Sequence, residues 1–207
     1  MQQITKEQLV SIENVTRRAA SRASEALSKL IGIPVRLEMT RTRIMEVERL
    51  AHILATPQES VSAVLLPVTG EDHTGSSALI SSLVESHRLA ELVMKRPKGY
   101  LTKLDDIATS AITETANIIG GAFLSVLSDT TGISLVQSVP SFLTSTMQEV
   151  VDAVVAKLHD GDGKLSVAFE TDFQLRTTTT TTETVITHYI FILKVAFAKK
   201  LLEALGK

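Results

Sequence analysis

The chain has 207 residues, 44% of them hydrophobic and 21% charged, and a formal net charge of −2 at neutral pH. This composition is typical of a folded protein and excludes a disordered chain. The nearly balanced charge indicates no nucleic-acid partner, and a cysteine count of zero excludes disulfides and thiol catalysis. No signal-peptide core and no apolar run of roughly 18 residues occurs, so we expect a cytoplasmic protein without membrane insertion.

In the first half of the chain, a helix is predicted over residues 5–31, where apolar residues recur at steps of three and four. Thr5 with Gln8 matches a capping box, and Gly32 is a typical helix stop. The following segments are predicted from their β-branched content, their alternation and their bounding Pro and Gly: strands at 34–47 and 60–70, a turn with a short strand at 69–81, and a helix at 82–96.

The second half repeats this order in part. Its predicted elements are a long helix at 102–132, an extended piece at 133–141, a helix at 143–158, strands at 163–177 and 182–193, and a closing helix or tail at 194–207. Each half thus has a long helix, strands and a second helix, with the order in the second half partly permuted. We interpret this as an internal duplication within one α/β domain, residues 1–207, with pseudo-repeat halves of about 1–100 and 101–207.

Three other features carry weaker signals. The threonine run Thr177–Thr182 favours a hairpin crossing or an exposed edge strand, with phosphorylation or glycosylation as alternatives. Residues 159–164, "HDGDGK", look faintly like a calcium loop, but Thr171 stands where the bidentate glutamate belongs, which favours a hairpin turn. The five histidines are scattered without metal-ligand spacing, so no metal site is expected.

The long helix at 102–132 has two different sides. One is an apolar stripe that predicts the buried side: Ile112, Ala116, Ile119, Phe123 and Val126. The opposite side carries small and polar residues: Ser110, Glu114, Asn117 and Gly121. A carboxylate and an amide three residues apart can therefore face outward from a helix that is otherwise part of the core.

That outward pair has a defined chemistry. Glu114 supplies a fixed negative charge for a partner's cation, and Asn117 supplies both hydrogen-bond donors and an acceptor. An amide that positions water can accelerate phosphoryl hydrolysis. Neither Ser110 nor Thr113 has a histidine base nearby in sequence, so a nucleophilic role is not indicated. Without further context, a glutamate and an asparagine on an exposed helix face are also ordinary surface residues.

The wider motif resembles a known signature. Ser110-x3-Glu114-x2-Asn117, followed after 22 intervening residues by Pro140, resembles that of the CheC/CheX/FliY family, phosphatases of the phosphorylated chemotaxis response regulator CheY. Residues 25–38, 65–80 and 112–132 are also similar to stretches of CheC. The resemblance implies a single CheC-like domain with an internal pseudo-two-fold repeat, in which a β-sheet carries two long exposed helices.

The resemblance also implies a role for each residue. Glu114 would pair with a lysine of the partner, and Asn117 would enter the partner's active site and orient the attacking water. Ser110 occupies the first motif position, and Pro140 would shape the loop after the helix. Independently of the resemblance, the small Gly121 leaves this helix face flat, so that a partner can come close. The resemblance places the Mg²⁺ and the phosphoaspartate in CheY, so no cofactor or metal is expected on this chain.

CheC proteins often carry a second such site in the first helix, and here it is degenerate. Asn14 stands where the glutamate belongs and Arg17 where the asparagine belongs, and Ala19 and Ser21 stand where small glycines would be. A bulky cation cannot orient water as an amide does, so we expect a silent first site. Alternatively, Arg17 with its neighbours Arg18 and Arg22 forms a basic face that binds an acidic group or is simply solvated.

The resulting hypothesis is a phosphatase that dephosphorylates CheY and terminates the signal. The alternative is a non-catalytic adaptor that binds phosphorylated CheY or the receptor deamidase CheD, which is the second candidate partner.

Overall fold

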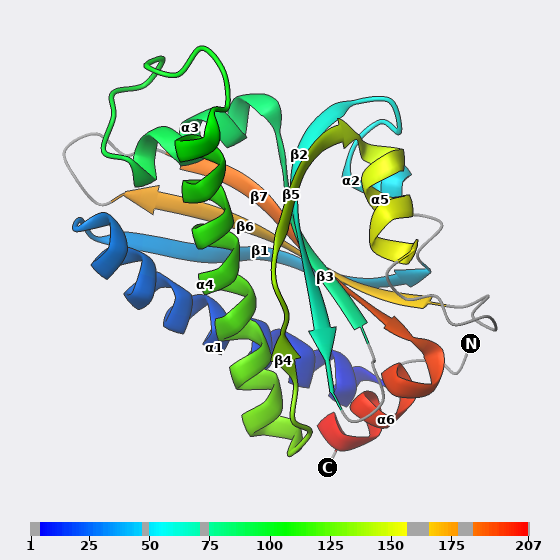
Figure 1. The fold of residues 1–207 in the computed structure, drawn as a ribbon. Coiled ribbons are helices and arrows are strands. Elements are labelled where there is room, and N and C mark those ends of the chain that lie inside the picture. The colour runs from blue at the N-terminus through cyan, green and yellow to red at the C-terminus, as the bar shows by residue number, and fades with distance from the viewer. Residues whose placement is uncertain (1–4, 47–49, 71–74, 157–165, 178–183, 207) are drawn as a thin grey trace.

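The computed structural model describes residues 5–46, 50–70, 75–156, 166–177 and 184–206 (Figure 1). Six helices and seven strands follow one another within these ranges: α1 (Lys6–Ile31), β1 (Val35–Glu46), α2 (Leu50–Leu54), β2 (Ser60–Thr69), β3 (Gly75–Ser82), α3 (Leu83–Val93), α4 (Asp106–Thr131), β4 (Val136–Gln137), β5 (Ser141–Thr146), α5 (Met147–Ala156), β6 (Ser166–Thr177), β7 (Thr184–Lys194) and α6 (Val195–Leu205).

The described strands form one antiparallel sheet in the order β1-β6-β7-β3-β2-β4, with β5 also paired to β2. If the halves are exchanged, so that β1 corresponds to β5, β2 to β6 and β3 to β7, the pairings are unchanged. The β3–β7 pair lies at the centre of this symmetry. The predicted α/β fold with an internal pseudo-two-fold repeat is confirmed.

The predicted permutation of the second half is wrong. Each half runs helix, strand, short helix, two strands and helix, with the first strand of the second half split into β4 and β5. Sequence periodicity missed α2, because five residues give barely more than one helical turn. It also placed the start of the helix predicted at 143–158 too early.

Residues 143–146 belong to β5 rather than to that helix, which begins at Met147 as α5. The strand pairs with β2 in the register Leu143↔Ala63, so its backbone groups are used in the sheet. The β-branched Thr144 and Thr146 suit this extended conformation. The open edge of β2 therefore decided the conformation of a segment whose apolar period alone suggested helix.

The two long helices are equivalent at a constant offset of 100 residues. Both α1 and α4 have 26 residues, begin after the N-caps Thr5 and Asp105, and end at the left-handed C-caps Gly32 and Gly132, with φ of 75° and 71°. The capping box of Thr5 with Gln8 is present as predicted. The helices pack against each other (Figure 1). Each residue of one half can therefore be compared with the residue 100 positions away in the other half.

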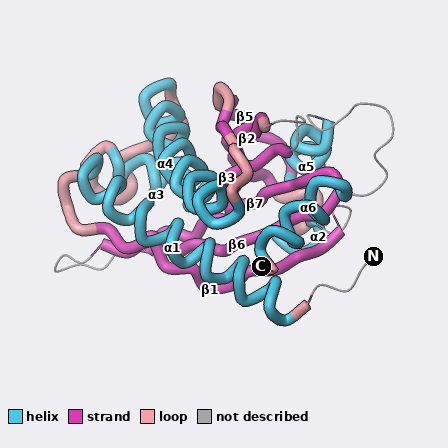
Figure 2. The backbone as a smooth tube through the Cα atoms, turned by 90° about the horizontal axis from the view of Figure 1, so that it is seen from below, coloured by secondary structure: helices cyan, strands magenta, loops and turns pink. Residues whose placement is uncertain are grey.

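The sheet is covered on both faces, which produces two cores. Val64 and Leu66 of β2 join the larger core under α1, α3, α4 and α6, whereas Ala63 and Leu65 join the smaller core with α2 and α5. Figure 2 shows α2 and α5 together, apart from α1, α3 and α4. Because both sets of side chains are buried, β2 is almost continuously apolar instead of cleanly alternating.

Helix α4 is the central helix of the larger core. All five residues of its predicted apolar stripe are buried, and the ring centroid of Phe123 lies 5.1 Å from that of Tyr189 and 5.7 Å from that of Phe191. By length and composition alone α4 would be apolar enough to cross a membrane, but half of that stretch is buried inside the molecule. Its hydrophobicity is accounted for by packing in the core.

Two sequence features fall largely outside the described residues. Thr177 ends β6 and pairs with Val35 of β1, whereas the remainder of the threonine run, 178–182, is not among the described residues. The segment 159–164 is likewise outside them. The hairpin interpretations of both segments therefore stay predictions.

Candidate functional site

The outer side of α4 carries an exposed carboxylate beside a half-buried amide. Ser110, Glu114 and Gly121 are exposed and Asn117 is half-buried. A Cβ added at Gly121 would meet nothing within 4 Å, so this side of the helix is flat there. Glu114 makes no ion pair within the part of the chain that the structure describes, which leaves its charge available to a partner.

Asn117 is held by a residue from a different element. The side-chain Nε2 of Gln137 donates a hydrogen bond of 2.9 Å to Oδ1 of Asn117. One lone pair of that oxygen and both N–H groups of the Asn117 amide remain available. The contact fixes the plane of the Asn117 amide while leaving it able to bind water.

The backbone that carries Gln137 is itself anchored. Gln137 belongs to the two-residue strand β4, which pairs with β2 in the register Val68↔Gln137. Immediately after it, the Ser138 amide donates a 2.8 Å hydrogen bond to the Pro67 carbonyl. The side chain therefore reaches α4 from a fixed position at the sheet edge.

Gly120 provides the space for this arrangement. A Cβ at Gly120 would lie 2.4 Å from Oε1 of Gln137 and 3.1 Å from Cδ1 of Leu66, so the Gln137 side chain occupies the room that an alanine would take. Oε1 is buried and has no hydrogen-bond partner among the described residues. An unsatisfied buried carbonyl costs about 1–3 kcal/mol. In this orientation the Gln137 amide donates a hydrogen bond to Asn117, whereas its own oxygen is left without a partner among the described residues.

Pro140 lies between β4 and β5, three residues after Gln137, and is half-buried. The Asn117–Gln137 bond brings the segment that contains Pro140 beside α4. Two valines of this segment are prominent: Val136 is 58% exposed and Val139 is 83% exposed. The motif residues on the helix and the distant proline therefore belong to one surface region, with apolar side chains at its margin.

At the equivalent positions of α1, Asn14 and Arg17 are both exposed and contact each other, with Arg17 Nη1 donating to Asn14 Oδ1 at 3.2 Å. The neighbouring arginines are used differently. Arg18 donates to Thr130 Oγ1 at 3.2 Å, and Arg22 donates to Ser125 Oγ at 2.8 Å and to Asp129 at 3.0 Å. Arg18 and Arg22 thus connect α1 to α4 while remaining exposed, and the acidic group that Arg22 pairs with is on the same chain.

The half-to-half offset identifies two residues that are not among the predicted site residues. Gly120 corresponds to Ala20 rather than to Ala19 as predicted, and Gln137 corresponds to Leu37; Ala20 and Leu37 are both buried in the apolar core. The equivalence extends to hydrogen bonds: Val35 N donates to Ser28 Oγ in the first half, as Leu135 N does to Ser128 Oγ in the second. A comparison of the two halves in sequence would have shown that the polar Gln137 stands at the position equivalent to the apolar Leu37.

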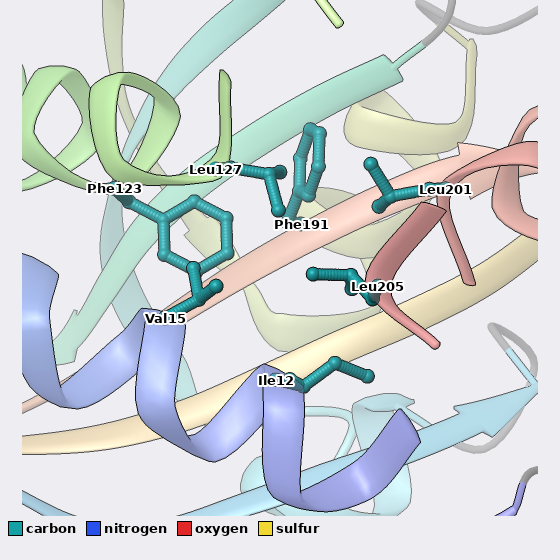
Figure 3. Close-up of a pocket in the computed structure, with 7 residues that line it drawn as sticks. All are labelled: Ile12, Val15, Phe123, Leu127, Phe191, Leu201 and Leu205. Atoms are coloured by element: carbon teal, nitrogen blue, oxygen red, sulfur yellow. The ribbon is translucent and has the colours of Figure 1, made fainter. Parts of the chain in front are cut away.

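The cavity between α1, α4, α6 and β7 is not a chemical site. Its volume is about 10 Å³, and it is lined by seven apolar side chains that point toward one another (Figure 3): Ile12, Val15, Phe123, Leu127, Phe191, Leu201 and Leu205. This is about the space of one water, and a buried water needs polar partners. The chemistry-bearing residues lie on the outer side of α4 instead.

The other titratable groups among the described residues form no alternative centre. Burial raises the pKa of the Tyr189 hydroxyl, which keeps it protonated in the core. In the ranges that the structure describes, no group of three or more His, Cys, Asp or Glu side chains is placed to hold a metal ion. The surface around Glu114 and Asn117 is therefore the arrangement we consider for function.

Comparison with known proteins supports the resemblance seen in the sequence. No family model matches the chain. It is 24% identical over 139 residues to the CheY-P phosphatase CheC of Bacillus subtilis, covering 66% of each chain. It is also 24% identical over 165 residues to a protein of Halobacterium salinarum named as a CheC-type CheY-P phosphatase, covering 79% of this chain and 81% of the relative.

Solved structures share the fold over nearly the whole chain. FliY of Thermotoga maritima matches with a TM-score of 0.74 at 19% identity, covering 99% of this chain and 98% of FliY. The FliM middle domain of H. pylori matches with a TM-score of 0.63 at 12% identity, covering 97% and 99%. CheX in complex with CheY, beryllofluoride and magnesium, from Borrelia burgdorferi, matches with a TM-score of 0.51 at 16% identity, covering 87% and 96%. The resemblance is thus confirmed in sequence by the CheC relatives and in fold by FliY and CheX.

Proposed function

We propose that this chain dephosphorylates the aspartyl phosphate of a CheY-type response regulator. The observation that carries the proposal is the exposed Glu114 beside an Asn117 amide that Gln137 holds in place. Two relatives at 24% identity are named as CheY-P phosphatases, and a CheX of similar fold was solved in complex with CheY. These similarities support the substrate class.

Each residue then has one task. Glu114 docks the partner by pairing with a lysine, because it is exposed and makes no ion pair within the described part of the chain. Asn117 accepts a hydrogen bond from the attacking water at the free lone pair of Oδ1, which directs the water oxygen toward phosphorus. Ser110, Gly121 and Pro140 belong to the docking surface around this pair.

The reaction is a direct transfer to water. The water oxygen forms a bond to phosphorus while the bond from phosphorus to the aspartyl oxygen breaks. The electron pair of that bond leaves with the aspartate carboxylate, and the protons of the water are divided between the inorganic phosphate and solvent. No covalent intermediate forms on this chain, and its contribution is positioning and electrostatics. The Mg²⁺ that phosphoryl transfer requires is supplied by the regulator, and we place the reaction in the cytoplasm.

The test is phosphate release from a phosphorylated CheY-type regulator with Mg²⁺ present, with wild type and Asn117→Ala compared side by side. We expect faster release with wild type and no acceleration with Asn117→Ala, while regulator binding persists. The matched control is Arg17→Ala, at the position of α1 equivalent to Asn117, which should retain the wild-type rate. Full activity in Asn117→Ala would contradict the mechanism.

The alternative is a non-catalytic adaptor. It is favoured by the similarity in fold to the FliM middle domain, one match of which comes from a structure titled as a FliG–FliM complex. Binding of the phosphorylated regulator, or of CheD, without any change in phosphate release would establish this alternative over the phosphatase.

A further inference from the structure

We propose that Gln137 is the positioning residue of the site, holding the Asn117 amide in the orientation that the reaction needs, and that Gly120 exists to make room for it. This inference rests on the proposed phosphatase function and deepens it. Gly120 and Gln137 are not among the motif residues Ser110, Glu114, Asn117 and Pro140, and each has a task that can be tested separately.

The geometry of the contact between Gln137 and Asn117 supports a positioning role. An asparagine on a helix surface can rotate its amide, and an amide rotated by half a turn presents N–H groups where the carbonyl oxygen should be. The 2.9 Å bond from Gln137 Nε2 to Asn117 Oδ1 removes this freedom. Because Gln137 lies on β4, paired with β2, it serves as a fixed reference that α4 alone cannot provide.

The unsatisfied side-chain oxygen of Gln137 also indicates a functional role. Oε1 of Gln137 is buried and has no hydrogen-bond partner among the described residues. For stability alone an apolar side chain of similar length would serve better at this position. A polar group retained at a cost to stability is typical of a functional site.

The two halves differ at both of these positions. One hundred residues earlier, Leu37 and Ala20 occupy the positions of Gln137 and Gly120, in the half where Arg17 replaces the asparagine. A Cβ at Gly120 would approach Gln137 Oε1 to 2.4 Å, so the glycine and the glutamine depend on each other. The first half lacks the catalytic asparagine. It also lacks the glycine and the glutamine that position this asparagine in the second half.

The test is Gln137→Met, which keeps the side-chain length and removes the amide. Expected results are a turnover of the phosphorylated regulator lowered about 10- to 100-fold, a KM close to that of wild type, and a melting temperature equal to wild type or higher. A purely structural role would lower the melting temperature together with the activity. Lower turnover without a lower melting temperature therefore distinguishes a positioning role from a structural one. Gln148→Met, which removes an exposed bond to Asp152 on α5, is the matched control and should retain wild-type turnover.

Two further measurements make the result decisive. Gly120→Ala displaces the Gln137 side chain and should lower turnover in the same way. The side-chain NH₂ resonances of Asn117, identified by their loss in Asn117→Ala, should shift in Gln137→Met and not in Gln148→Met. Wild type that does not accelerate phosphate release overturns the proposed function, and the positioning role falls with it. Active wild type with full turnover and unshifted Asn117 resonances in Gln137→Met overturns the positioning role alone.

Discussion

Arg22 of α1 and Asp129 of α4 form an ion pair of 3.0 Å that joins the two long helices, with the two side chains 47% and 53% exposed. An exposed ion pair contributes little, because water screens it and both side chains lose freedom. Arg22→Ala should therefore lower the free energy of unfolding, measured by urea denaturation, by about 1 kcal/mol or less. Arg17 donates its hydrogen bond to Asn14 on the same helix, so Arg17→Ala is the control and should change the free energy of unfolding less. A loss of several kcal/mol would contradict this estimate.

The C-cap of α4 gives a second prediction. Gly132 has φ of 71°, and a Cβ there would meet nothing within 4 Å, so substitution is opposed by backbone conformation alone. Gly132→Ala should lower the free energy of unfolding by about 1–2 kcal/mol. Gly121→Ala, inside the helix and also facing open space, should raise it by about 0.5–1 kcal/mol. Equal effects of the two changes in thermal unfolding would contradict the assignment of φ as the cause.

The N-terminus of α5 should make stability depend on pH. Hydrogen bonds from Ser145, then from the backbone and side chain of Thr146, lower the pKa of Glu149 below its ordinary value of 4.5. Since the folded-state pKa is the lower one, the stabilisation is fully present above 4.5 and is lost as the pH falls through the folded-state pKa.

Urea unfolding across the acid range should therefore show a shallower fall in stability for Glu149→Gln than for wild type. Near neutral pH the variant should be the less stable of the two. Asp152→Asn, one turn later on the same helix, serves as the control. Parallel curves for Glu149→Gln and wild type would exclude this carboxylate as a source of the acid dependence.

The charge of Glu114 predicts a salt effect. If Glu114 docks the regulator through an ion pair, KM for the phosphorylated regulator should rise with ionic strength in wild type. Glu114→Ala should raise KM at low salt and flatten this dependence, with a smaller change in turnover. Steady-state kinetics over a range of NaCl concentrations measures both quantities. An unchanged KM in Glu114→Ala would remove the docking role.

The silent first site gives a prediction that joins the two halves. Asn14→Glu with Arg17→Asn restores the glutamate and the asparagine of the motif on α1 but leaves Leu37 where an amide donor is needed. We expect this double variant to add little to wild-type phosphate release, within about twofold. Addition of Ala20→Gly and Leu37→Gln should increase release further, with circular dichroism as the folding control. A large gain from the double variant alone would show that an orienting amide is dispensable.

The sequence by itself determined the long helices and the motif, because the interactions that define them are local. Thr5 and Gly32 mark the ends of α1 through hydrogen bonds to residues within four positions. Likewise, the spacing of Glu114 and Asn117 places both on the outer side of α4 whatever packs beneath it. Comparison with CheC-type proteins confirmed the resemblance that this spacing suggested.

Only the tertiary structure decided what surrounds the motif. Gln137 contacts Asn117 because β4, only two residues long, pairs with β2, and no local pattern predicts that pairing. The open edge of β2 likewise made residues 141–146 a strand, and the packing of α1 on α4 gave the exposed Arg22 an ion-pair partner on the other helix. In each case the partner is distant in the sequence, so the contact depends on how the whole chain packs.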